Sequence, residues 1–274
     1  MPLHLTHYPA LKLDGLLERD VWVWTPPAYQ AEPTNRFPVI YMHDGQNLFE
    51  PEKSYTHVTW GVAEAITRLS QWGFIRPAIV VGIDNTEKRF SDYLPARPFT
   101  SPEGIALLEK LAQEDPQTFQ NLTITSDIYL KLIVEEIKPR IDQHFRTKPG
   151  QQDTMVMGSS MGGLISLYAL TEYPDVFGGA GCFSTHWPVM RGLTLPYLRD
   201  HLPMPGKHKI YFDYGTGGFD AEYEPYQQAV DAVMRQKGYK HGVDWLTRCA
   251  PGADHHETAW RSRIHIPLRF FLGY

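Results

Sequence analysis

The stretch TMVMGSSMGGLISLYAL, residues 154–170, decides the fold of this chain. Its first five residues are mostly apolar and end in glycine, which predicts a short buried strand, and residues 161–170 predict a helix that follows at once. The pentapeptide GSSMG at residues 158–162 matches G-x-S-x-G, a weak signal alone that gains weight from this context. Small flanking residues let strand and helix nearly touch, and the strained turn lifts the serine clear of the sheet. We therefore predict Ser160 as a nucleophile.

Short apolar segments alternate with helical patterns on both sides of this turn. Further strands are expected at residues 19–26, 37–45, 77–84, 178–184, 207–215 and 244–252. Helices are expected at residues 61–71, 126–145, 224–235 and 260–272, the second bent by Pro139. This alternation predicts a single α/β domain over residues 1–274, with a mostly parallel, doubly wound sheet flanked by helices on both faces. Such sheets place their sites beyond the carboxyl ends of the strands.

One segment, residues 95–125, breaks the alternation. It is polar, contains prolines and is partly helical at GIALLEKLAQ. A long excursion of this kind at the active edge of a sheet is often a lid or a binding loop. Two interpretations therefore stand side by side: a lid-like insertion, or a surface insertion with no role in the site.

Composition excludes several classes of function. The net charge of −5 argues against a nucleic-acid surface, and no run of eighteen apolar residues exists that could span a membrane. The start, MPLHLTHYPALKLDG, does not have the basic and apolar pattern of a signal peptide, which favours a cytoplasmic protein. The two cysteines, Cys182 and Cys249, are too few for a disulfide framework and are expected as free thiols. Nothing in the sequence indicates an oligomeric state.

A serine hydroxyl needs a base and an acid to become a nucleophile, and both should follow Ser160 in the chain. The loop GTGGFDAEYEP after the strand at 207–215 offers Asp220 as the acid, with Glu222 and Glu224 as alternatives. Asp213 lies within that strand and is interpreted as structural. The last strand is followed by GADHHETAW, where His255 is preferred as the base over its neighbour His256.

Backbone amides are expected to bind the oxyanion. The amide of Met161 begins a helix, where the dipole adds to its hydrogen bond. A second amide should come from the loop after an earlier strand, and Gln46 in the segment HDGQN occupies that place. Its neighbour Gly45 permits a close approach of the backbone.

A further group of side chains is expected near the site, either as a substrate pocket or as ordinary packing. They follow the strand at 178–184 or lie after the strand at 77–84: His186, Trp187, Met190, Arg89 and Tyr93.

Together these stretches resemble the putative-esterase family of the α/β-hydrolase superfamily, which includes enterochelin-esterase-like, feruloyl-esterase and esterase-D-like enzymes and mycolyltransferases. The matching motifs stand in the family's order: VIYMHDGQNLFE, IVVGID followed by RFSDYLP, GSSMGG, DYGTGGFD and HHETAW. The resemblance implies an α/β-hydrolase fold and hydrolysis of a small-molecule carboxylic ester without a metal or other cofactor. It also implies Ser160, Asp220 and His255 as the catalytic triad, with oxyanion amides from Gln46 and Met161.

Two other functions remain open at this point. An acyltransferase of the same fold would use an alcohol in place of water. A hydrolase-fold binding protein would have lost catalysis, although such a protein has no need for a complete Ser, Asp and His set.

Overall fold

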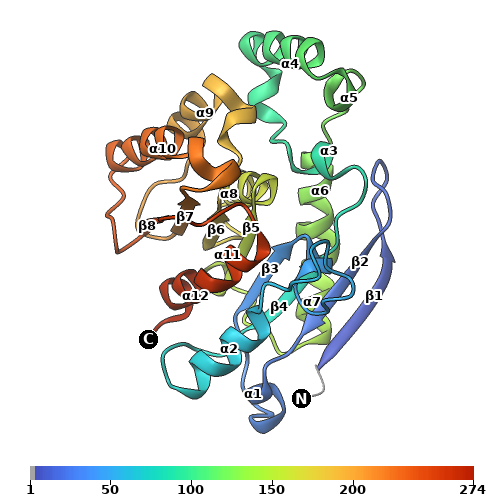
Figure 1. Cartoon of the computed structure of the whole chain (residues 1–274). Coiled ribbons are helices and arrows are strands. Elements are labelled where there is room, and N and C mark those ends of the chain that lie inside the picture. The colour runs from blue at the N-terminus through green and yellow to red at the C-terminus, as the bar shows by residue number, and fades with distance from the viewer. Residues whose placement is uncertain (1–3) are drawn as a thin grey trace.

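An eight-stranded sheet runs through the molecule (Figure 1), in the order β1-β2-β4-β3-β5-β6-β7-β8. The computed structural model describes residues 4–274. The strands are β1 Leu5–Leu11, β2 Arg19–Trp24, β3 Val39–His43, β4 Ile79–Ile83, β5 Thr154–Ser159, β6 Gly179–Phe183, β7 Lys209–Gly215 and β8 Trp245–Ala250. Six neighbouring strands, β4, β3, β5, β6, β7 and β8, are parallel to one another. At one edge of the sheet, β2 pairs antiparallel with both β4 and β1. The predicted mostly parallel sheet is confirmed.

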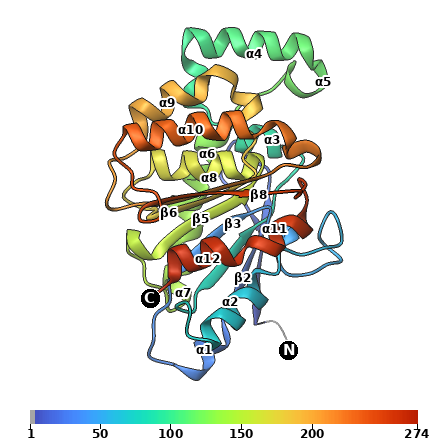
Figure 2. The same ribbon diagram turned by 60° about the vertical axis from the view of Figure 1, so that its left-hand side comes forward.

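Helices cover both faces of this sheet (Figure 2). The α-helices are α1 Pro27–Ala31, α2 Val62–Gln71, α3 Arg89–Tyr93, α4 Pro102–Glu114, α5 Pro116–Phe119, α6 Ser126–Lys131, α7 Lys138–His144, α8 Met161–Glu172, α9 Thr194–His201, α10 Glu224–Gln236, α11 Glu257–Arg263 and α12 His265–Leu272. Successive strand residues point to opposite faces, so Tyr41 enters the core shared with α6, α8 and α10, whereas Ile40 and Met42 enter the core shared with α2 and α12. Each face therefore has its own hydrophobic core.

Two predicted helices are divided in the structure. The expected helix at 126–145 consists of α6, a π-helical turn at Leu132–Ile137, and α7. Pro139 lies in the first turn of α7 and carries no N–H to donate to the preceding turn, which accounts for the irregular stretch before it. The expected helix at 260–272 begins earlier and consists of α11 and α12, which meet at Ile264.

The edge strand β1 was not predicted. Its side chains alternate irregularly, all of them are at least partly exposed, and its sequence LTHYPAL includes a proline. Proline is tolerated there because an edge strand needs fewer ladder hydrogen bonds. Both cysteines are free thiols, with Cys182 buried in β6 and Cys249 exposed in β8.

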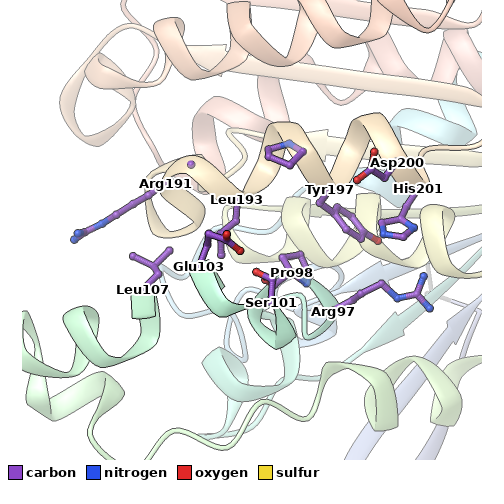
Figure 3. A pocket seen from close by; sticks show the side chains of 12 residues that line it. Arg97, Pro98, Ser101, Glu103, Leu107, Arg191, Leu193, Tyr197, Asp200 and His201 are labelled. Atoms are coloured by element: carbon purple, nitrogen blue, oxygen red, sulfur yellow. The ribbon is translucent and has the colours of Figure 1, made fainter. Parts of the chain in front are cut away.

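The 95–125 segment forms α4 and α5, which lie on the outer side of α9, away from the sheet (Figures 1 and 2). A cavity of about 660 Å³ separates the segment from α9 and the turn before it (Figure 3). Leu107 of α4 and Tyr197 of α9 lie on opposite walls of this cavity. An ion pair between Glu114 and Arg191 also joins the two sides. The segment thus lies over the helical layer of the domain, with this cavity between them.

Candidate active site

Ser160 stands between the end of β5 and the start of α8, in a strained backbone conformation with φ 58° and ψ −122°. The turn is tight because a Cβ on Gly158 would lie 2.8 Å from the carbonyl carbon of Gly162. The Ser160 amide donates to the carbonyl of Phe183 at 2.9 Å, and its carbonyl accepts from the amide of His186 at 3.2 Å, so β6 holds the turn on one side. The Ser160 side chain is partly exposed and lines a pocket.

His255 lines the same pocket, and Asp220 is hydrogen-bonded to it. Asp220 lies in the short helical turn Gly218–Glu222 after β7, and His255 lies in the loop between β8 and α11. His255 Nδ1 and Asp220 Oδ1 are 2.6 Å apart, which leaves Nε2 of the imidazole for another partner. Burial alone would raise the pKa of Asp220, but hydrogen bonds from His255, Ser184 and the amide of Gly215 hold that pKa below its usual value. Asp220 is therefore a carboxylate at neutral pH.

The alternative acids and the alternative base do not form such a pair. Glu222 and Glu224 are exposed, and Glu224 accepts hydrogen bonds from Tyr214 and Gln228. His256 also lines the pocket, but its Nδ1 caps the start of α11 by accepting from the amide of Thr258 at 3.2 Å. The geometry thus favours Asp220 and His255 over these neighbours.

Asp213 has the structural surroundings that the sequence indicated. It is fully buried and accepts two hydrogen bonds of 2.9 Å from Arg263 of α11. Tyr211 donates a further hydrogen bond to it at 2.8 Å. This ion pair ties β7 to the helix that follows the His255 loop.

The loop after β3 lies beside the nucleophile turn. Asp44 has left-handed backbone angles, φ 58° and ψ 47°, and Gly45 packs so closely on β4 that a Cβ there would lie 2.6 Å from the backbone of Gly82 and Ile83. Gln46 follows within the turn Gly45–Asn47 and lines the Ser160 pocket. Met161 buries its side chain while its amide opens α8, where no carbonyl of the same helix precedes it. Of the two residues expected to bind the oxyanion, Gln46 therefore lines the pocket, and Met161 directly follows Ser160 in the chain.

Arg89 is the main support of this loop. Its Nε and Nη2 donate to Asp44 Oδ1 and Oδ2 at 2.7 and 2.8 Å, and its side chain also lines the pocket. Asp44 would have a raised pKa from burial, but Arg89 and Asn85 hold it below the usual value. For Tyr93, which was expected either in a substrate pocket or in ordinary packing, the structure shows packing. The Tyr93 side chain is fully buried, its ring packs under Arg89, and its hydroxyl accepts from the Asp44 amide at 3.2 Å.

The residues expected after β6 separate into two groups. His186 lies beside the His255 cluster, with its ring stacked on Phe219 and its Nδ1 2.7 Å from the Tyr223 hydroxyl. Burial lowers the pKa of His186 to about 4, so the ring is neutral. Trp187 and Met190 do not form a substrate pocket, because both are only 2% exposed. The indole of Trp187 turns beneath α10 and donates to Gln227 at 3.0 Å.

The Ser160 pocket has a volume of about 550 Å³ and includes residues that the sequence reading missed. Tyr55 and Thr56 come from the loop before α2, and Thr56 donates to the buried Glu257 at 2.9 Å. Glu257 stands in the motif HHETAW, where an acid beside two histidines was the available signal. Within residues 4–274, the 95–125 segment contributes no lining residue to this pocket, which favours the surface-insertion interpretation.

Across residues 4–274, no group of three or more histidine, cysteine or acidic side chains is arranged to hold a metal ion. None of the helices described there has the length and hydropathy needed to cross a bilayer.

Known proteins share both sequence and fold with this chain. It is 24% identical over 197 residues to the protein YbbA of Bacillus subtilis (strain 168), covering 71% of this chain and 66% of that protein. It is 30% identical over 168 residues to the ferri-bacillibactin esterase BesA of the same organism, covering 60% of this chain and 51% of BesA. The chain therefore spans only half to about two thirds of the length of these relatives.

Solved structures confirm the α/β-hydrolase architecture. An IroE-like serine hydrolase from Shewanella oneidensis superposes with a TM-score of 0.73 at 18% identity, over 97% of this chain and 79% of that one. The family model described as "Putative esterase" matches residues 17–270, which is nearly the whole sequence. The resemblance seen in the motifs is thereby confirmed, and the chain belongs to the putative esterase family.

Proposed function

We propose that this chain hydrolyses small-molecule carboxylic esters through an acyl-enzyme on Ser160. The observation that carries the proposal is that a serine held in a strained turn and an imidazole line one pocket, and that a buried carboxylate lies 2.6 Å from this imidazole. Membership of the putative esterase family supports the same reaction. The pocket volume of about 550 Å³ lies in the range that suits a small organic ligand.

In the first half-reaction, Ser160 Oγ attacks the ester carbonyl while His255 Nε2 takes its proton. Asp220 fixes the imidazole through Nδ1 and stabilises the imidazolium that forms. The negative charge on the carbonyl oxygen is stabilised by the amides of Gln46 and Met161. The imidazolium then protonates the departing alcohol.

In the second half-reaction, water replaces the alcohol. His255 removes a proton from the water as it attacks the acyl carbonyl, and collapse of the second tetrahedral species returns that proton to Ser160. No hydrogen bond joins Ser160 to His255 within residues 4–274, and such contacts commonly tighten only when the substrate is bound.

The test is Ser160→Ala, assayed with p-nitrophenyl acetate and with a fluorophosphonate probe. We expect kcat to fall by at least about 10³-fold and labelling to disappear, because this hydroxyl is the attacking group. Ser70→Ala serves as the control, since Ser70 lies on α2 and its hydroxyl donates to the carbonyl of Thr67. Normal turnover by the folded Ser160→Ala protein would refute the proposal.

Two further outcomes decide between this function and its rivals. If added methanol diverts most of the product to the methyl ester at low concentration, the protein is an acyltransferase. If the folded wild-type chain neither turns over esters nor reacts with the probe, it is a binding protein.

A further inference from the structure

Ser184 is a buried hydroxyl that the reaction described above does not use. It follows β6 directly, is fully buried, and has a positive φ of 39°, a backbone region that residues other than glycine adopt rarely. Its amide donates to the carbonyl and to Oδ1 of Asp213, both at 3.0 Å, which holds it in that conformation. A strained residue held in this way beside a candidate active site often has a function there.

The hydrogen bonds of Ser184 Oγ leave its hydroxyl only one orientation. A hydroxyl has one hydrogen to donate and can accept two hydrogen bonds. Trp260 Nε1 at 3.1 Å and Arg263 Nη2 at 2.9 Å can only donate, so they occupy both accepting positions. The hydrogen of Ser184 therefore points to its remaining neighbour, Asp220 Oδ2, which lies 2.6 Å away.

This contact determines how Asp220 is held. Oδ2 accepts from Ser184 and from the amide of Gly215 at 2.8 Å, so Oδ1 is left for His255. The guanidinium of Arg263 is itself fixed by two hydrogen bonds to Asp213. Its positive charge therefore acts on Asp220 through the Ser184 hydroxyl rather than by direct contact.

Resting on the proposed function, we propose that Ser184 is a positioning residue for catalysis. Its hydroxyl, polarised by Arg263 and oriented by Trp260, fixes the carboxylate of Asp220 so that Oδ1 holds His255 in the orientation needed to take the serine proton. Trp260 adds to this by packing edge-on against the His255 ring, with centroids 5.1 Å apart. The lowered pKa of Asp220 agrees with this arrangement.

The test compares Ser184→Ala with Thr185→Val. Thr185 is the next residue, is equally buried, and its hydroxyl has no partner among residues 4–274, so Thr185→Val controls for the loss of a buried hydroxyl in this loop. We expect Ser184→Ala to lower kcat by about 10-fold to 100-fold, which corresponds to loss of one hydrogen bond to a charged group. KM should stay within about 2-fold, because Ser184 lies outside the substrate pocket.

The pH profile separates positioning from a purely structural role. The titratable side chains around His255 include Asp220, Tyr223, His186 and the adjacent Asp254, and none of them is altered by the substitution. A carboxylate that loses a donor favours the protonated imidazole more strongly, so the acid limb of kcat/KM should move upward by about 0.5–1 pH unit. Thr185→Val should leave kcat and the limb unchanged.

The inference is overturned if folded Ser184→Ala keeps kcat within about 2-fold of wild type, or loses activity with an unchanged acid limb. If this variant does not fold, Trp260→Phe replaces it, because that change removes one donor that orients the hydroxyl. A fall in kcat with the same shift of the limb then supports the inference, and an unchanged kcat overturns it. These failures differ from failure of the proposed function, which would show as wild-type protein without turnover or as an active Ser160→Ala variant.

Discussion

Replacing Asp44 by asparagine tests whether a buried ion pair holds in place the loop at residues 44–47, which we propose as the oxyanion loop. Asp44 accepts from Arg89 at 2.7 and 2.8 Å and from the Asn85 side chain at 2.5 Å. Its φ of 58° is a conformation that asparagine adopts readily, so the substitution removes the charge without adding backbone strain. Gln46, whose amide is proposed to bind the oxyanion, follows Asp44 by two residues in the same turn, so a shift of Asp44 should displace that amide.

The expected cost follows from burial. Removing one partner of a fully buried ion pair costs about 3–5 kcal/mol. The Arg89 side chain is 30% exposed whereas that of Asp44 is 8% exposed, so water can solvate part of the orphaned guanidinium. We therefore expect the free energy of unfolding at pH 7 to fall by about 2–3 kcal/mol. Displacement of one oxyanion donor can cost up to about 10²–10³ in kcat, and a shifted loop should cost about 10-fold to 100-fold.

The pH dependence of this loss has a defined sign. Because the pKa of Asp44 is lower in the folded chain than in the unfolded one, its charge stabilises the fold above the unfolded pKa of about 3.9. That contribution is lost as pH falls through the lower folded pKa. The difference in stability between wild type and Asp44→Asn should therefore shrink below about pH 4.

Urea unfolding followed by tryptophan fluorescence measures the change, and a double-mutant cycle with Arg89→Met isolates the pair. Glu18→Gln is the control, because Glu18 and Lys12 form an exposed pair at 2.9 Å whose loss should cost less than about 1 kcal/mol. A cost for Asp44→Asn below about 0.5 kcal/mol, or a coupling energy near zero, would refute the reasoning.

Two further predictions concern the turn and its surroundings. Gly158→Ala places a Cβ 2.8 Å from the backbone of Gly162, so β5 and α8 must separate. We expect the free energy of unfolding, measured in a thermal or urea melt, to fall by about 1–3 kcal/mol, and most of the esterase activity to be lost. A normally active variant would contradict this. His186 has a folded pKa of about 4 against 6.5 for an unperturbed histidine, so the unfolded chain takes up the proton first as pH falls. His186 should therefore lower the free energy of unfolding by up to about 2 kcal/mol as the pH falls from 7 to 5. In His186→Gln, the free energy of unfolding measured in urea should depend correspondingly less on pH. An unchanged profile would show that His186 is not buried in its neutral form.

The sequence revealed the parts of the site that are determined locally or by chain order. The turn that holds Ser160 is local, since residues 158–162 carry the pattern and the flanking strand and helix adjoin it in the sequence. Asp220 and His255 could be predicted to meet because each follows a strand whose carboxyl end reaches the same edge of a parallel sheet. For these residues, chain position and place in the fold are closely linked.

Side-chain direction and long-range pairing were not predictable in this way. Trp187 and Tyr93 follow strands that end near the site, yet both side chains turn into the core, where burial of a large aromatic ring outweighs exposure in the pocket. The contact between Ser184 and Arg263 joins residues 79 positions apart, and that between Asp44 and Arg89 joins residues 45 apart. A single sequence contains no signal for such contacts, because many arginines could meet many carboxylates.

Two ion pairs that flank the site suggest how a buried carboxylate would serve His255 in the proposed reaction. Asp44 is paired with Arg89 on the side of the oxyanion loop, and Asp213 is paired with Arg263 on the side of the base. Each pair contributes little net charge, whereas Asp220 forms no ion pair with an arginine among residues 4–274 and faces a histidine instead. In the proposed reaction, the charge of Asp220 is therefore available to stabilise the imidazolium that forms when Ser160 gives up its proton. If Asp220 were bonded directly to Arg263, the guanidinium would already neutralise that charge. The neutral hydroxyl of Ser184 between them keeps the carboxylate ionised and oriented while leaving its charge for His255.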